Sequence, residues 1–198
     1  MLRPHTVIRE DRPDGSILLR SGYEMGAVAA KTGDWLDKWA VETPHAVFLA
    51  ERSGAGWREV SYLEARGMVG PLAAALLARG MGPETPLMIL SGNSVYHALL
   101  TLAAQYVGVP TVPLAEQYSL IPGARAQLVH CSELIRPHMV FAEDGARFGR
   151  ALSLDVFEGV EKVVTRNAGP GMQELLRLFA TLETQEVQDA AAGVGPDT

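Results

Sequence analysis

The sequence predicts an α/β protein in which a mostly parallel sheet is flanked by helices and preceded by N-terminal β-hairpins. Two observations lead to this fold class. Residues 86–165 alternate short apolar runs with longer helical patterns over short connections, which implies right-handed crossovers between parallel strands. Near the N-terminus, two pairs of strand-like runs are each joined by residues that favour tight turns, which predicts hairpins.

This pattern divides the chain into three expected parts. Residues 1–61 hold the hairpins and a short helix, residues 62–167 form an α/β Rossmann-like subdomain, and residues 168–198 form a helical tail. Hydrophobic residues make up 47% of the chain, which is enough to build a proper core.

Residues that favour tight turns separate the predicted strands of the N-terminal part. Arg12-Pro13-Asp14-Gly15 and Ser53-Gly54-Ala55-Gly56 each separate two runs of strand-like composition. Between these hairpins, Trp35, Leu36 and Trp39 share one face of a predicted helix. The expected elements are strands at 6–10, 16–20, 46–51 and 57–61 and a helix at 34–43.

The middle part opens with a capping box, because Ser61 and Glu64 can each satisfy a free backbone N–H group at a helix start. Gly67, Gly70 and Pro71 are expected to weaken or kink this helix. Further along, the first predicted strand is wholly apolar, as in sheets covered on both faces. We expect strands at 87–90, 111–114, 139–142 and 162–165 and helices at 94–107, 123–136 and 146–157.

Two of these helices carry informative patterns. The helix at 94–107 has one narrow polar stripe, because its polar residues recur four positions apart. The stripe consists of Asn93, His97, Thr101 and Gln105. The helix at 123–136 is expected to bury one face, made of Ala124, Leu128, Cys131 and Ile135. In the tail, residues 172–182 and 185–192 look helical, and we expect no strand after these two segments.

Composition narrows the possible partners and compartments. The formal net charge of −6, without any long Lys/Arg run, argues against a nucleic-acid partner. Cys131 is the one cysteine, so an internal disulfide framework is excluded and a reducing compartment fits. No signal sequence and no apolar run long enough to span a bilayer are present, which predicts no membrane partner and a cytoplasmic location.

No phosphate-binding loop is present in the sequence. Such a loop needs several glycines before a Lys and a Ser/Thr, so that backbone N–H groups surround the anion. Lys31-Thr32 follows Ala30 and no strand leads into it, so ordinary loop residues are expected there. The glycine pairs at 54 and 56 and at 80 and 82 lack the strand-then-helix context of a dinucleotide fingerprint.

Ser94 is the nearest approach to a catalytic nucleophile. Gly92-Asn93-Ser94-Val95-Tyr96 follows a strand and opens a helix, but Tyr96 stands where a nucleophile elbow has its second glycine. A triad would need His138 with Glu116 or Glu133. The alternative interpretation is that Asn93 or Ser94 caps the helix.

The histidines and the clustered arginines do not indicate a metal-binding or anion-binding site. The five histidines at positions 5, 45, 97, 130 and 138 are scattered, and with one cysteine they predict no structural zinc site. Arg125, Arg136, Arg147 and Arg150 could face an anion, but they fit a solvated surface equally well. We therefore predict no catalytic, cofactor-binding or metal-binding residue in this chain.

Several segments together resemble the beginning of an adenylate-forming enzyme of the acyl-CoA synthetase (AMP-binding) superfamily. Residues 57–65, Trp-Arg-Glu-Val-Ser-Tyr-Leu-Glu-Ala, resemble an early strand-to-helix signature, and residues 103–114 resemble the next one, in which Gly108 ends a helix before a strand. Three further segments, at 33–36, 48–52 and 89–94, look most like the feruloyl-CoA synthetase branch, whose substrates are hydroxycinnamic acids.

The resemblance runs over nearly the whole chain and implies an incomplete N-terminal part of the acyl-CoA synthetase large domain. The implied parent enzyme is an ATP-dependent acid–thiol ligase that uses ATP, Mg²⁺ and CoA and forms an acyl-adenylate. The Ser/Thr/Gly-rich phosphate loop and the catalytic Lys of that family come later in its chain, and residues 193–198 look like the segment just before that loop. We therefore expect this fragment to be inactive by itself, to bind none of these cofactors, and to have the C-terminal remainder as its partner.

Two alternatives remain beside the hydrolase. A stand-alone flavodoxin-like module would bind a ligand at the carboxyl ends of its strands, where residues 116–119 and Glu143-Asp144 are the polar candidates. A non-catalytic interaction module would associate with itself through exposed apolar surface.

Overall fold

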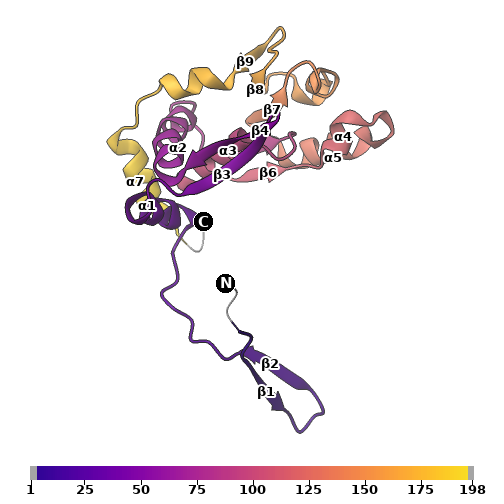
Figure 1. The fold of residues 1–198 in the computed structure, drawn as a ribbon. Helices are drawn as coiled ribbons and strands as arrows, with labels where there is room; N and C mark the ends of the chain where they lie inside the picture. The colour runs from indigo at the N-terminus through magenta and orange to yellow at the C-terminus, as the bar shows by residue number, and fades with distance from the viewer. Residues whose placement is uncertain (1–3, 196–198) are drawn as a thin grey trace.

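The computed structural model describes residues 4–195, and its centre is a five-stranded parallel sheet (Figure 1). The strand order is β6-β5-β7-β8-β9, and every neighbouring pair is parallel. Numbered along the chain, this is the order 2-1-3-4-5 of flavodoxin-like proteins. The strands are β5 (Leu87–Ile89), β6 (Thr111–Pro113), β7 (Met139–Asp144), β8 (Glu161–Arg166) and β9 (Met172–Glu174). The predicted α/β fold class is confirmed.

Helices cover both faces of this sheet. Alternate strand residues point to opposite faces, so Phe141 packs with α2 (Tyr62–Leu77) and α3 (Val95–Tyr106), whereas Val140 packs on the side of α5 (Arg125–Ile135). Short helical segments complete the layers. They are α4 (Glu116–Leu120), α6 (Gly149–Leu152), and the 3₁₀ turns η1 (Pro122–Ala124), η2 (Asp155–Phe157) and η3 (Leu175–Ala180).

The long helix α2 passes through its predicted weak point as a single helix. The capping box at its start is present, because Ser61 accepts from the Glu64 N–H group and Glu64 accepts from the Ser61 N–H group at 2.8 Å. Pro71 lies inside the helix without ending it. Leu72 and Leu76 are fully buried, and this packing outweighs the propensity cost of Pro71.

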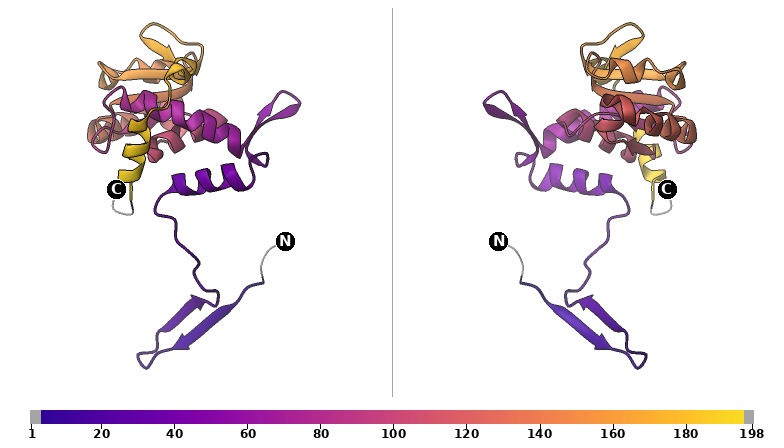
Figure 2. Two further views of the ribbon diagram at one scale, coloured as in Figure 1. Left: turned by 90° about the vertical axis from the view of Figure 1, so that its left-hand side faces the viewer. Right: turned by 90° about the vertical axis from the view of Figure 1, so that its right-hand side faces the viewer.

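Two hairpins precede the sheet. The β3–β4 hairpin (Val47–Ser53 and Gly56–Ser61) lies over α2 and α3, after α1 (Thr32–Glu42). The β1–β2 hairpin (Val7–Asp11 and Ile17–Ser21) stands apart from the body at the end of an extended linker at 22–31 (Figure 2). We call residues 4–30 the N-terminal arm.

The C-terminal tail differs from the all-helical segment that the sequence predicts. Residues 172–174 form strand β9 at the edge of the sheet, paired with β8 through Val163 and Gln173. The expectation that residues 172–174 are helical is therefore wrong. Leu175–Ala180 is a 3₁₀ turn rather than an α-helix, and α7 (Gln185–Gly193) is the helix predicted at 185–192.

Two other predicted helices are shorter than expected. The segment 146–157 forms α6 and η2, and the segment 123–136 begins with η1 before α5. The buried face of α5 also differs from the prediction, because Leu128 and Ser132 are buried whereas Cys131 is half-buried. Ser132 fits this apolar position because its hydroxyl donates to the Leu128 carbonyl at 2.8 Å. Among the described residues, no helix is long and apolar enough to cross a bilayer.

Candidate functional site

The carboxyl edge of the sheet is where proteins with this strand order bind their ligands, between the first and third strands. Here that crevice lies between β5 and β7, and the chain's own side chains meet in it. The Glu116 carboxylate lies 2.9 Å from the Arg147 guanidinium. A Cβ atom at Gly92 would lie 3.0 Å from the Glu116 carboxyl carbon, so the carboxylate closely approaches the loop after β5.

The next pair of strand ends is equally occupied. Asp144 accepts hydrogen bonds from the Ala146 and Arg147 N–H groups, and Arg166 donates to both Asp144 and Glu143. Although partial burial acts to raise the pKa of Asp144, these hydrogen bonds and those from Asn167 outweigh it and hold the pKa at about 2. An anionic phosphate would meet ionised carboxylates at this edge.

The N-terminus of α3 offers no anion site either. Ser94 accepts a hydrogen bond from the His97 N–H group at 3.1 Å, and Glu51 of β3 accepts one from the Val95 N–H group at 2.8 Å. Helix N-termini bind phosphates through such free N–H groups. In this chain the Glu51 carboxylate from the neighbouring hairpin already holds the Val95 N–H group, and Arg58 pairs with that carboxylate at 3.0 Å.

The residues of a possible Ser94 triad are not brought together. Ser94 follows the carboxyl end of β5, whereas His138 precedes β7 and its N–H group donates to the Pro86 carbonyl at the opposite edge of the sheet. Glu116 pairs with Arg147, and Glu133 is exposed on α5. The capping interpretation of Ser94 is the one that the geometry supports.

Lys31 and Thr32 are structural residues. The Lys31 ammonium donates to the Ala191 carbonyl in the last turn of α7, and the Thr32 hydroxyl donates to Gln105 at 3.1 Å. Lys31 therefore ties the start of α1 to the tail. Within residues 4–195, no cluster of His, Cys, Asp or Glu could hold a metal ion.

A groove of about 720 Å³ separates the β3 strand from helix α3. On the α3 side it is lined by most of the predicted polar stripe, namely Asn93, His97 and Thr101. The Thr101 hydroxyl is buried and has no hydrogen-bond partner, and the His97 Nδ1 atom lies 3.0 Å from the Gly92 carbonyl. The stripe thus borders a groove, a role that the helical pattern alone could not indicate because the other wall comes from a distant segment.

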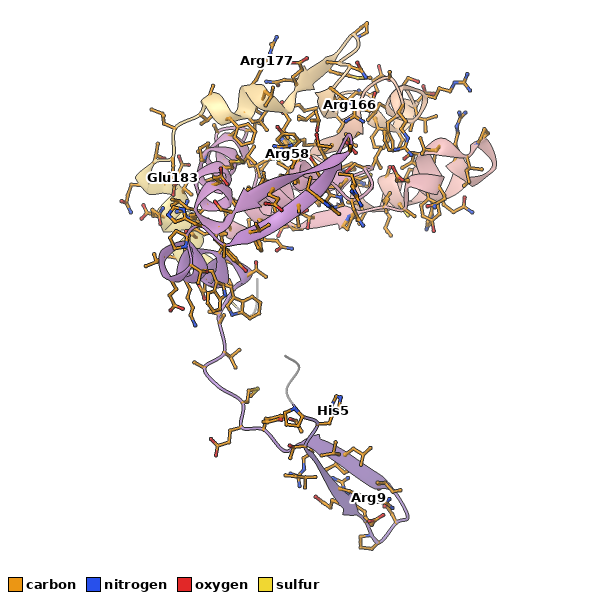
Figure 3. The ribbon with its side chains drawn as sticks, in the orientation of Figure 1. His5, Arg9, Arg58, Arg166, Arg177 and Glu183 are labelled. Carbon is orange, nitrogen blue, oxygen red and sulfur yellow. The ribbon has the colours of Figure 1, made fainter. Side chains whose placement is uncertain are left out.

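A polar cluster that sequence reasoning missed joins four segments of the chain. Arg66 of α2 donates to Asp37 of α1 at 2.6 Å and to Glu183 of the tail at 2.9 Å, and Tyr106 of α3 donates to Asp37 at 2.9 Å. Figure 3 places Glu183 on the tail beside α2. Burial, aided by the hydrogen bond to Asp37, raises the pKa of Tyr106 to about 12. A Cβ atom at Gly70 would lie 1.8 Å from the Glu183 carboxylate, so this glycine admits the tail.

Comparisons with known proteins give a family match, a relative in sequence and several similar folds. A family model described as AMP-binding enzyme matches residues 36–194. The probable nonribosomal peptide synthetase CymA of Salinispora arenicola is 28% identical over 143 residues, which cover 70% of this chain and 2% of that protein. This chain therefore spans a very small share of that relative.

Solved structures share the fold. The acetoacetyl-CoA synthetase from Streptomyces lividans superposes with a TM-score of 0.64 at 18% identity. The match covers 78% of this chain and 25% of the synthetase chain. The luciferase-like enzyme from the mealworm Zophobas morio gives a TM-score of 0.61 at 14% identity. This match covers 85% of this chain and 37% of the luciferase-like enzyme. The chain thus spans about a quarter to a third of the length of these two structures.

Proposed function

The chain belongs to the AMP-binding enzyme family and carries part of its adenylate-forming domain, and from this premise we propose that it supplies framework to a carboxylate–CoA ligase. In the whole enzyme, a substrate carboxylate oxygen would attack the ATP α-phosphate, giving an acyl-adenylate and pyrophosphate. The CoA thiol would then attack the acyl carbon and release AMP. The family match over residues 36–194 is the observation that carries this proposal.

The described residues do not fit a site for ATP and Mg²⁺ of their own. At the start of α3, Glu51 takes the Val95 N–H group and Ser94 takes the His97 N–H group, and Arg147 is paired with Glu116. Catalysis of phosphoryl chemistry depends on donors that are free to meet developing negative charge. The reactive groups are therefore expected in the rest of the enzyme, and this part by itself should not turn over substrate.

For the acid we propose a hydroxycinnamic acid such as ferulic acid. The support is the likeness of segments 33–36, 48–52 and 89–94 to the feruloyl-CoA synthetase branch. The segment 48–52 contacts the residue directly after the segment 89–94, since Glu51 accepts a hydrogen bond from the Val95 N–H group. A branch-specific contact between this hairpin and α3 would leave such a pattern in the sequence.

The remainder of the domain is the proposed partner, and exposed aromatic surface supports it. Trp35 and Trp39, which lie four positions apart on α1 and so share one face of it, are 58% and 36% exposed. Large apolar side chains gathered on one surface usually mark a contact with another polypeptide segment.

The test is ATP–pyrophosphate exchange. The purified chain should show no exchange with ferulate, ATP and Mg²⁺ above a protein-free blank. Adding the C-terminal part of a feruloyl-CoA synthetase, produced separately, should restore exchange, and ferulate should be preferred over acetoacetate. Exchange by the chain alone would contradict the framework role, and a preference for acetoacetate would contradict the hydroxycinnamate assignment.

The strand order 2-1-3-4-5 favours one second candidate, a stand-alone ligand-binding module. Millimolar ATP would then raise the melting temperature, because ligand at a hundredfold its Kd stabilises by about 2.7 kcal/mol. The occupied crevice leads us to expect no shift, and a shift abolished by Arg147→Ala would favour this candidate.

A further inference from the structure

The groove between β3 and α3 has the size and the walls of a small-molecule site. Its volume of about 720 Å³ is typical of ligand pockets, which are lined mainly by apolar side chains with a few polar groups among them. Phe48 and Leu49 contribute apolar surface on the β3 side, and Ala98 and Leu102 contribute it on the α3 side. We call this feature the β3–α3 groove.

Both fully charged side chains of the β3–α3 groove are directed to other residues. The Glu51 carboxylate accepts a hydrogen bond from the Val95 N–H group at 2.8 Å and lies 3.0 Å from the Arg58 guanidinium. The Arg52 guanidinium lies 4.2 Å from the Trp57 ring centroid, where it makes a cation–π contact. Neither charge is directed to a ligand, so the groove suits a neutral molecule.

His97 determines which hydrogen bond a ligand can make in this groove. Its Nδ1 atom lies 3.0 Å from the Gly92 carbonyl oxygen, which can only accept, so Nδ1 carries the proton. In the neutral ring, Nε2 is then a hydrogen-bond acceptor. No described residue bonds Nε2, and this atom is not buried. Because His97 lines the groove, a ligand there can donate a hydrogen bond to Nε2.

Thr101 lies one turn further along α3 and lines the same groove. Its hydroxyl is buried and has no hydrogen-bond partner among the described residues. Native proteins pair most of their buried polar atoms, so two neighbouring side chains with unused hydrogen-bonding capacity mark this wall as a ligand site. A threonine in a helix has two common χ1 rotamers, so this hydroxyl can turn to a ligand.

We propose that the β3–α3 groove binds a phenol, that is, a neutral aromatic ring whose hydroxyl donates a hydrogen bond to Nε2 of His97. Phenols titrate at about pH 10, so the hydroxyl still holds its proton at neutral pH. The ring suits the apolar walls, because Phe48 already stacks on Tyr62 with centroids 4.6 Å apart, and a further ring extends such an aromatic cluster favourably.

This inference goes beyond the proposed function, since the ligand class follows from the groove walls and from His97 and needs no ligation step. Hydroxycinnamic acids contain a phenolic hydroxyl as well, but a simple phenol tests the groove without them. Pyrophosphate exchange plays no part in the binding experiment, so the proposed function and this inference can fail separately.

The test compares two ligands that differ only in the donor, 4-ethylphenol and its methyl ether 4-ethylanisole. Each is titrated into the purified wild-type chain at about pH 8, where histidine is ordinarily neutral, and the ring signals of His97 are followed by NMR. The phenol should move these signals to a limiting value at millimolar concentration or below. The ether should bind about three- to tenfold more weakly, which is the contribution of one hydrogen bond.

His97→Phe removes the acceptor and keeps an aromatic ring in the groove wall. In this variant the two ligands should bind with equal affinity, measured through the Leu102 methyl signals. His130 is exposed on α5 and does not line the groove, so His130→Phe is the matched control and should keep the wild-type preference. Comparing the two ligands within each protein cancels any change in the fold that a substitution causes.

Three outcomes would overturn the proposal. The first is that 4-ethylphenol gives no saturable shift of the His97 signals, or shifts only residues outside the groove. The second is that the wild-type chain binds the phenol and the ether equally well. The third is that the preference for the phenol survives in His97→Phe or disappears in His130→Phe.

Discussion

The parallel-sheet body and the N-terminal arm contain strands of similar length and apolar content but very different burial. In the body, Leu87, Ile89 and Phe141 are completely buried between two helical layers. In the arm, Val7 and Leu19 are 62% and 63% exposed, although they lie in regular strands. Strand-forming sequence is therefore enough to make a ladder, whereas burial against helices is what makes a folded core.

The largest loss of stability is expected for Phe141→Ala at the centre of the sheet. Phe141 is fully buried on the middle strand β7, so truncation removes apolar contact and leaves a cavity. The free energy of unfolding should fall by about 3–5 kcal/mol, measured by urea denaturation followed by circular dichroism. A loss below about 1 kcal/mol would mean that the body is no better packed than the arm.

Gly70→Ala should destabilise the protein by loosening the contact between the C-terminal tail and α2 of the body. The added Cβ would lie 1.8 Å from the Glu183 carboxylate, so this side chain must shift from the position in which it bonds Arg66. We expect a loss of about 1–3 kcal/mol in the free energy of unfolding, typical of a partly buried charge left without its partner.

Gly67→Ala is the matched control in the same helix. A Cβ atom at Gly67 would meet no atom within 4 Å. The added helix propensity should stabilise the protein by about 0.5–1 kcal/mol in the same denaturation assay. Equal effects of the two substitutions would refute a tertiary role for Gly70.

Tyr106 allows a pH test that concerns the body alone. Its pKa is raised from 10.0 to about 12, so the folded state holds the phenolic proton more tightly than the unfolded state does. This contribution is fully present below pH 10 and is lost as the pH rises toward 12. Unfolding free energies at pH 9 and pH 11.5 should therefore differ more in the wild type than in Tyr106→Phe. An equal pH dependence in both proteins would contradict it.

The smallest effect is expected in the arm. Ile17→Ala removes a half-exposed side chain that packs against nothing in the body, so unfolding should change by less than about 0.5 kcal/mol. A larger loss in the same urea assay would show that the arm folds as one unit with the sheet.

The helical layers and most strands could be predicted because their signals are local. Ser61 and Glu64 predict the start of α2, and the turn residues before Gly15 and Gly56 predict the two hairpins. Strand β9 was missed because its three residues merge into a helical pattern and owe their extended form to pairing with β8. Tertiary pairing overrides local propensity in such short segments.

The site could be predicted only in part, for the same reason. The stripe of His97 and Thr101 was visible, but the β3 wall of the groove lies more than forty positions earlier in the sequence. Gly70 was expected to weaken a helix, whereas its small size also admits Glu183 from a segment 113 positions away. Close approaches of this kind leave no periodic signal.

The bond from Lys31 to the Ala191 carbonyl brings the two ends of the body together. A short glycine-rich linker could therefore join residue 195 to residue 30, and new termini could be opened in the exposed turn around Gly82 and Pro83. Such a circularly permuted chain should keep the five-stranded sheet, since it changes the order of the segments and interrupts only the turn between Gly82 and Thr85.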